Sequence, residues 1–178
     1  MRTGLNAKLG NWLVVGVLMV LMSMASVSDA RAQTQGLTQE EIDSLTYIRE
    51  EEKLARDVYL FLYDKWGLRI FDNIEVSEQT HMDAIQTLLY KYGIADPAAD
   101  TGVGVFINQD LEASYVSLIE TGSRSVVDAL NVGVLIEETD IADLNEAIES
   151  STHKDIINVY EKLLAGSKNH LKAFNSHL

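Results

Sequence analysis

Apolar residues recur at helical spacing along four segments of this chain. The segments are Leu37 to Trp66, Asn73 to Tyr92, Ser125 to Ser150 and His153 to Phe174. Each segment carries an apolar stripe of the kind that one face of an α-helix buries. Thr38 followed by Glu41 predicts a capping box at the start of the first helix, and Gly67 predicts its end.

Residues 93–124 separate the first two helices from the last two and break the helical pattern. Asp96-Pro97 and the glycines of 102–104 are turn signals, while Leu111 to Ile119 predicts a short helix. A connection of this length can run along a whole helix bundle. The pattern therefore predicts an all-α fold, a ferritin-like four-helix bundle of two antiparallel hairpins joined by a long crossover containing a short helix. An ordinary bundle with an inserted loop is the alternative.

The first 32 residues differ from the rest of the chain. A basic N-terminal stretch precedes the charge-free apolar run Trp12 to Met24, and Ala30 and Ala32 are small residues at the −3 and −1 positions of a cleavage site. The run is short for a membrane span, which needs about 20 residues. We expect 1–32 to be a cleavable secretory signal peptide, or alternatively a retained anchor. The domain 33–178 is then periplasmic or secreted, without stable membrane insertion after cleavage.

Charge and cysteine content narrow the chemistry. The chain has 14 Lys and Arg against 27 Asp and Glu, a net charge of −13, and no Cys. The negative charge argues against a nucleic-acid partner, because affinity for phosphate backbones comes from Lys and Arg. The lack of Cys excludes disulfides, thiolate metal sites and cysteine nucleophiles. Any redox chemistry must then use carboxylate and imidazole ligands.

Acids and histidines stand at positions where the apolar stripes predict core. They are Glu51 and Glu52 on the first helix, Glu78 and His81 on the second, Glu137 and Asp140 on the third, and Ser167 and His170 on the fourth. A buried carboxylate without a partner costs several kcal/mol. The basic residues Lys53 and Arg56 fall at or beyond the edges of the stripe, so a divalent cation is the predicted partner. The alternative is that these acids face solvent or form a buried polar layer without a metal.

The spacing of these residues matches a di-metal pattern. Such bundles use one Glu from each of two helices and a Glu-x-x-His from each of the other two. The five matching residues are Glu52, Glu78, His81, Glu137 and His170. Ser167 occupies the sixth position, where the pattern has Glu, and Asp140 is the candidate replacement. Otherwise the site holds one ion, or two with an open position. Carboxylate and imidazole ligands suit iron or manganese.

Four segments around these residues together resemble one family. They are EEEKLARDVY (50–59), SEQTHM (77–82), VGVLIEETDI (132–141) and GSKNHLKAF (166–174). The family is the ferritin-like one catalogued as domain of unknown function 2202. More distantly, the motif Glu52-x-x-Ala55-Arg56-x-x-Tyr59 is similar to the first-helix ligand motif of rubrerythrins. That similarity favours Glu52 over Glu51, although Glu51 lies nearer the centre of the apolar arc.

The rubrerythrin resemblance also implies a function. Rubrerythrins use two carboxylates spaced i, i+3 on the third helix, as Glu137 and Asp140 are spaced here. The resemblance implies a di-metal oxidoreductase acting on peroxide or dioxygen, although Ser167 departs from the pattern and would lie beside the ligands. Tyr59, one helical repeat past Glu52, is a candidate hydrogen-bond donor to the ligands, with core packing as the alternative role. Because the chain has no Cys for a rubredoxin-type module, the electron donor must be external. Metal sequestration without turnover and a metal-free interaction module are the alternatives, and a homodimer stays open.

Overall fold

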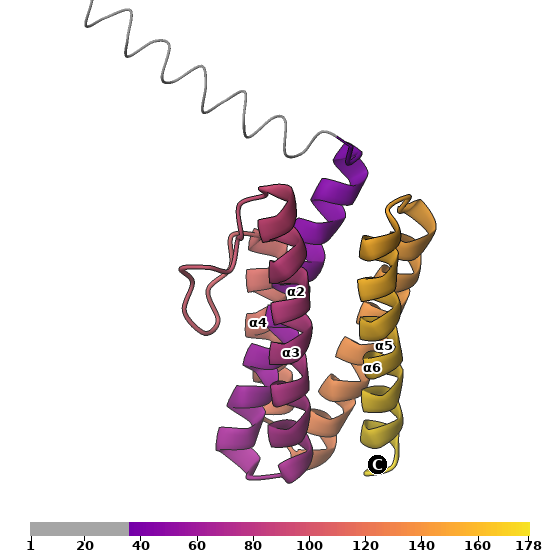
Figure 1. Ribbon diagram of the computed structural model, residues 1–178. Coiled ribbons are helices and arrows are strands. Elements are labelled where there is room, and N and C mark those ends of the chain that lie inside the picture. The colour runs from indigo at the N-terminus through magenta and orange to yellow at the C-terminus, as the bar shows by residue number, and fades with distance from the viewer. Residues whose placement is uncertain (1–35) are drawn as a thin grey trace, which may run out of the picture. The chain divides into compact units, whose positions relative to one another are not determined.

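The computed structural model describes residues 36–178, so the predicted signal peptide lies outside the described residues. These residues form five α-helices and no β-strand, which confirms the all-α class. The helices are α2 (Gln39–Trp66), α3 (Arg69–Tyr92), α4 (Gln109–Gly122), α5 (Val126–Ser150) and α6 (Lys154–Asn175). Helix α2 packs along α3 and α5 packs along α6, while α4 contacts both α2 and α5 (Figure 1).

Within the described range, no helix is both long enough and apolar enough to cross a membrane.

The predicted boundaries of α2 are nearly correct. The Thr38 side chain accepts a hydrogen bond from the Glu41 N–H, and the Thr38 N–H donates to Glu41 Oε2 at 2.9 Å, so the capping box is confirmed. The helix begins at Gln39 rather than Leu37 because Thr38 is the cap. At the other end, Gly67 adopts the left-handed conformation with φ 66°, and its N–H donates to the Tyr63 carbonyl.

The predicted start of α3 is wrong. The helix begins at Arg69, four residues before Asn73, although Leu68 offers no side-chain cap. Ile70 and Phe71 are buried in this first turn. Packing of apolar side chains therefore forms the turn without a polar capping signal, and such packing supplies most of a helix's stability in a folded protein.

Helix α4 is longer than the predicted stretch from Leu111 to Ile119. It begins at Gln109 because the Asn108 side chain accepts hydrogen bonds from the N–H groups of Asp110 and Leu111. Such a side-chain cap is the usual start of a helix.

The apolar core consists of two clusters of buried side chains. One includes Val58, Phe71, Ile136 and Phe174, and the other includes Leu45, Ile85, Leu144, Ile156 and Tyr160. Along each of α2, α3, α5 and α6, the predicted polar positions fall between residues of the first cluster and residues of the second. The fold therefore places a buried polar layer between two apolar layers.

Buried charged residues of α2 hold the connection that follows α3. Lys53 Nζ donates to Asp57 Oδ2 at 2.5 Å and to the Gly102 carbonyl at 2.8 Å, while the Gly104 N–H donates to Asp57 Oδ2. Glu50 Oε1 accepts from the Ile107 N–H at 2.6 Å. The expectation that Lys53 lies at the edge of the stripe is therefore wrong: its side chain is 1% exposed.

Candidate metal centre

The polar layer collects the predicted site residues from four helices. All are buried: Glu51 and Glu52 of α2, Glu78 and His81 of α3, Glu137 and Asp140 of α5, and Ser167 and His170 of α6. The solvent-facing alternative for the acids of α2 is wrong, because the whole run Glu50 to Glu52 is buried. Residues three apart on α3 share one face of the helix, which explains why Glu78 and His81 enter the layer together.

Glu78 lies at the centre of the contacts. Its Oε2 is 2.8 Å from His81 Nδ1, and its Oε1 is 2.9 Å from His170 Nδ1. His81 Nδ1 also lies 3.1 Å from Glu52 Oε2, and His170 Nδ1 lies 3.5 Å from Glu137 Oε2. Glu78 thereby belongs to two groups of three residues whose ligand atoms lie within 4.8 Å of one another, one with Glu52 and His81, the other with Glu137 and His170.

These distances fit a cation better than a closed hydrogen-bond network. Two ligand atoms about 2.1 Å from one octahedral ion lie about 3.0 Å apart. The buried polar atoms of the layer without a hydrogen-bond partner are Glu51 Oε2, Glu52 Oε1, Glu78 Oε1, Asp140 Oδ1 and His170 Nδ1. Glu78 Oε1 and His170 Nδ1 are therefore close together without being aligned as donor and acceptor. Buried groups without partners are rare, and a bound ion is one of their recognised explanations.

Neighbouring residues fix the orientation of the central side chains. Tyr59 donates to Glu137 Oε1 at 2.7 Å. His170 Nε2 lies 2.9 Å from Ser77 Oγ, so its Nδ1 faces Glu78 and Glu137. A hydrogen bond on the second ring nitrogen is how metal-binding histidines are usually held.

Four of the five carboxyl groups in the polar layer are harder to ionise than usual because they are buried. Burial raises the pKa of Glu137 to about 8 and that of Asp140 to about 7, against ordinary values of 4.5 and 3.8. Burial, with the neighbouring Asp140, also holds the pKa of Glu51 and of Glu52 well above 4.5. These carboxyl groups retain protons near neutral pH unless a cation replaces them.

The two imidazoles respond in the opposite sense to their burial. Burial alone lowers a histidine pKa, yet Glu52 and Glu78 raise that of His81 to about 11. Glu137 and Glu78 likewise raise the pKa of His170 to about 9 against the effect of burial. For Glu78, burial acts upward, but both imidazoles together lower its pKa to about 2. Glu78 is thus the ionised centre of the layer.

Ser167 stands at the sixth position of the di-metal pattern, and its hydroxyl is close enough to Asp140 to act against the burial that raises the pKa of that carboxyl. Ser167 is fully buried and its Oγ donates to the Leu163 carbonyl at 3.0 Å. Asp140, the candidate replacement, is buried but lies outside both three-residue groups. Glu52 is inside one of these groups and Glu51 is outside both, so the structure brings the first but not the second to the histidines.

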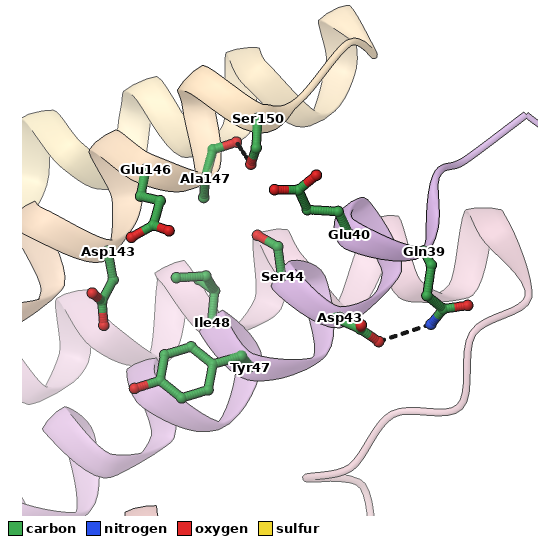
Figure 2. Close-up of a pocket in the computed structure, with 10 residues that line it drawn as sticks. All are labelled: Gln39, Glu40, Asp43, Ser44, Tyr47, Ile48, Asp143, Glu146, Ala147 and Ser150. Carbon is green, nitrogen blue, oxygen red and sulfur yellow. Dashed lines mark hydrogen bonds between the residues drawn. The ribbon is translucent and has the colours of Figure 1, made fainter.

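An open groove lies away from the histidines. It measures about 590 Å³ and is formed by the first turns of α2 and the last turns of α5. Figure 2 shows Glu40 and Asp43 on one wall and Asp143 and Glu146 on the other. A smaller hollow of about 290 Å³ lies between α2, α4 and α5, and Glu51 and Asp140 line it. Only the smaller one reaches the carboxylates of the layer.

One residue that shapes the site was missed in the sequence. A Cβ atom on Gly166 would lie 2.5 Å from His81 Nε2, so the absence of a side chain lets α6 approach the imidazole. The available signal was a glycine inside a predicted helix, where it costs about 1 kcal/mol relative to Ala and calls for a packing reason.

The fold and the site together define a helical protein with buried Glu and His groups that are able to hold a metal ion. The family model described as an uncharacterized protein domain, DUF2202, matches residues 41–178. The chain therefore belongs to this family, as the sequence motifs predicted.

Two similar proteins are described as uncharacterized and hypothetical. An uncharacterized protein of Methanocaldococcus jannaschii is 54% identical over 140 residues, which cover 79% of this chain and 76% of that protein. A crystal structure of a hypothetical protein from Methanococcus jannaschii DSM 2661 matches with a TM-score of 0.76 at 54% identity, covering 78% of this chain and 79% of that one. Function must therefore be argued from the site itself.

Proposed function

We propose that this protein binds one or two iron or manganese ions in the polar layer and uses them on peroxide or dioxygen. The observation that carries the proposal is the position of Glu78, whose two oxygens each approach a different histidine. A carboxylate so placed is suited to bridge two ions. Glu52 and His81 would complete one side, and Glu137 and His170 the other.

The chemistry of the donor set supports this reading. Carboxylate and imidazole ligands suit iron and manganese, and a bound pair of such ions supplies a site at which an oxidant is activated. The protein's own contribution is orientation: Tyr59 holds Glu137 and Ser77 holds His170. Since the chain has no Cys, the electrons would come from an external donor.

The family resemblance extends the proposal to fold and location. We infer that α2, α3, α5 and α6 form a ferritin-like four-helix arrangement, with α4 lying in the crossover. The pairing of α2 with α3 and of α5 with α6 supports this inference. Export of the domain rests on the apolar, basic-flanked segment 1–32 alone.

One observation argues against the alternative of a metal-free helical module. Without a cation, five polar atoms of the layer stay buried without a hydrogen-bond partner. Each such atom costs about 1–3 kcal/mol, and more when it is charged. Sequestration without turnover would use the same ligands, and it differs only in lacking reaction with an oxidant.

The test is a metal titration of chelator-treated protein. We expect Mn²⁺ or, without oxygen, Fe²⁺ to bind at one or two ions per chain and to raise the melting temperature, because an ion that binds only the folded chain stabilises it. Glu78→Gln should abolish binding. The matched control is Glu75→Gln, one helical turn away and outside both groups.

Two results would count against the proposal. Substoichiometric metal with an unchanged melting temperature would refute metal binding. Stoichiometric Fe²⁺ that is not oxidised faster than free Fe²⁺ by peroxide or dioxygen would leave sequestration as the function.

A further inference from the structure

The smaller hollow, between α2, α4 and α5, has the size of a site for a small organic molecule. Its volume is about 290 Å³, close to the lower end of about 300–1,000 Å³ for ligand pockets. Aliphatic side chains from all three helices line it, among them Leu54 of α2, Leu111 of α4 and Ile136 of α5. Such walls favour an apolar ligand body and are not needed by an ion alone.

Two buried carboxylates line the same hollow. Glu51 and Asp140 are each 5% exposed. Glu51 Oε2 and Asp140 Oδ1 have no hydrogen-bond partner. None of the described residues that line the hollow is Lys, Arg or His. The polar end of a ligand here would therefore meet two free acceptors and no protein cation.

The charge of the layer favours a cationic ligand. Its five carboxylates are Glu51, Glu52, Glu78, Glu137 and Asp140. When all are ionised they carry −5, so one divalent ion leaves −5 + 2 = −3 and two leave −5 + 4 = −1. Glu51 and Asp140 lie outside the two histidine-containing groups, so they are the carboxylates left for a further cation. Buried charges need partners, and an ammonium group offers a positive charge with three donors.

We propose that this hollow binds a small primary amine, with its ammonium group on Glu51 and Asp140 and its apolar body against Leu54, Leu111 and Ile136. The inference deepens the proposed function, since it assigns an organic ligand to the open side of the metal centre. Helix α4 covers the groove between α2 and α5 at this point, so the crossover forms one wall of the site.

The experiment measures benzylamine binding to the full-length chain by calorimetry, with and without saturating Mn²⁺. Benzylamine should bind in both conditions, and benzyl alcohol, which has the same shape without the charge, should bind at least about tenfold more weakly. Glu51→Gln should weaken benzylamine binding by a similar factor. The control Glu138→Gln removes a charge from an exposed position of α5 and should leave the affinity unchanged.

A second variant tests the cavity independently of the carboxylates. Ser114 is a half-buried residue of α4 that lines the hollow, so Ser114→Phe should fill it and abolish binding while the melting temperature is retained. Undiminished binding to Ser114→Phe, or equal affinity for benzyl alcohol, would overturn the inference. So would loss of benzylamine when Mn²⁺ binds, because Glu51 and Asp140 would then serve the metal. Failure of Mn²⁺ to bind would refute the proposed function alone.

Discussion

Gly166 is the residue on which the geometry of His81 depends most directly. It lies on α6, and the space where its Cβ would stand is occupied by the His81 ring, with Nε2 at 2.5 Å and Cε1 at 2.7 Å. His81 cannot simply move away, because its Nδ1 lies 2.8 Å from Glu78 and 3.1 Å from Glu52. A side chain at 166 must therefore displace either the imidazole or the helix.

We expect Gly166→Ala to weaken Mn²⁺ binding at least about tenfold, or 1.4 kcal/mol, as measured by calorimetry. Ala favours a helix over Gly by about 1 kcal/mol, so a weaker helix could not explain the loss. Gly102→Ala is the control, since a Cβ there meets nothing within 4 Å. Equal metal affinity of the two variants would show that His81 is not held by this contact.

At the scale of elements, Glu41 joins the start of α2 to the connection between α5 and α6. Its Oε2 accepts from the Thr38 N–H, and its Oε1 accepts from the N–H groups of Thr152 at 2.8 Å and His153 at 3.1 Å. Burial alone would raise the carboxyl pKa, but the hydrogen bonds from Thr152 and Thr38 lower it from 4.5 to about 2. Because the pKa of Glu41 is lowered, the stabilisation that this contact gives to the fold depends on pH.

A carboxyl group whose pKa is lower in the folded chain than in the unfolded chain stabilises the fold at pH values above its unfolded-state pKa. This stabilisation is lost as the pH falls towards the folded-state pKa. Glu41 should therefore contribute fully above about pH 5 and lose its contribution, about 1–3 kcal/mol, towards about pH 2. Urea unfolding of Glu41→Gln across this range should show a flatter pH dependence than the parent chain. Glu40→Gln, an exposed neighbour, should follow the parent curve, and identical curves for both variants would contradict the assignment.

Lys53 is a second residue that connects elements, because it links α2 to the segment before α4. Besides Asp57 and the Gly102 carbonyl, its ammonium group lies 4.3 Å from the centre of the Phe106 ring. Without Lys53, the Asp57 carboxylate keeps its ion pair with Arg56 at 2.7 Å, while the Gly102 carbonyl loses its donor. A hydrogen bond to a charged group contributes about 1.5–3 kcal/mol.

Lys53→Met should therefore lower the free energy of unfolding by about 1.5–3 kcal/mol in urea titrations. Lys65→Met, at an exposed position of the same helix, should change it by less than about 0.5 kcal/mol. Equal stability of the two variants would mean that the connection is held by its apolar contacts and not by the ion pair.

At the scale of the whole molecule, the polar layer separates two apolar clusters, so its charge state affects the packing of four helices together. The pKa values of Glu51, Glu52, Glu137 and Asp140 are raised mainly by burial, and those of His81 and His170 are raised by carboxylates against the effect of burial. In all six groups the folded chain binds protons more tightly than the unfolded chain. Stability then falls as the pH rises.

We expect the melting temperature of chelator-treated protein to decrease between about pH 6 and pH 9, because these protons are lost while the groups stay buried. Bound Mn²⁺ should remove or reverse this slope, since the ion replaces the protons. Scanning calorimetry with and without Mn²⁺ measures both curves. A metal-free chain whose stability rises over this range would contradict the pKa directions given above.

Sequence periodicity placed Glu52, Glu78, His81, Glu137 and His170 in one buried layer, because the 3.6-residue repeat of a helix determines which residues share a face. It also predicted the caps of α2, which depend on contacts within a few residues. The start of α3 and the burial of Lys53 could not be predicted in this way, since both depend on packing against residues distant in the chain.

The chain by itself thus determined the all-α class, the membership in its family and the set of polar residues that face inward. Only the tertiary structure decided which of these polar residues lie close to the histidines. It grouped Glu52 with the histidines and placed Glu51 and Asp140 outside these groups, where they line a hollow beside α4. The physical reason is that a helical repeat gives the direction of a side chain about one axis, whereas distances between side chains depend on how the helices pack against one another.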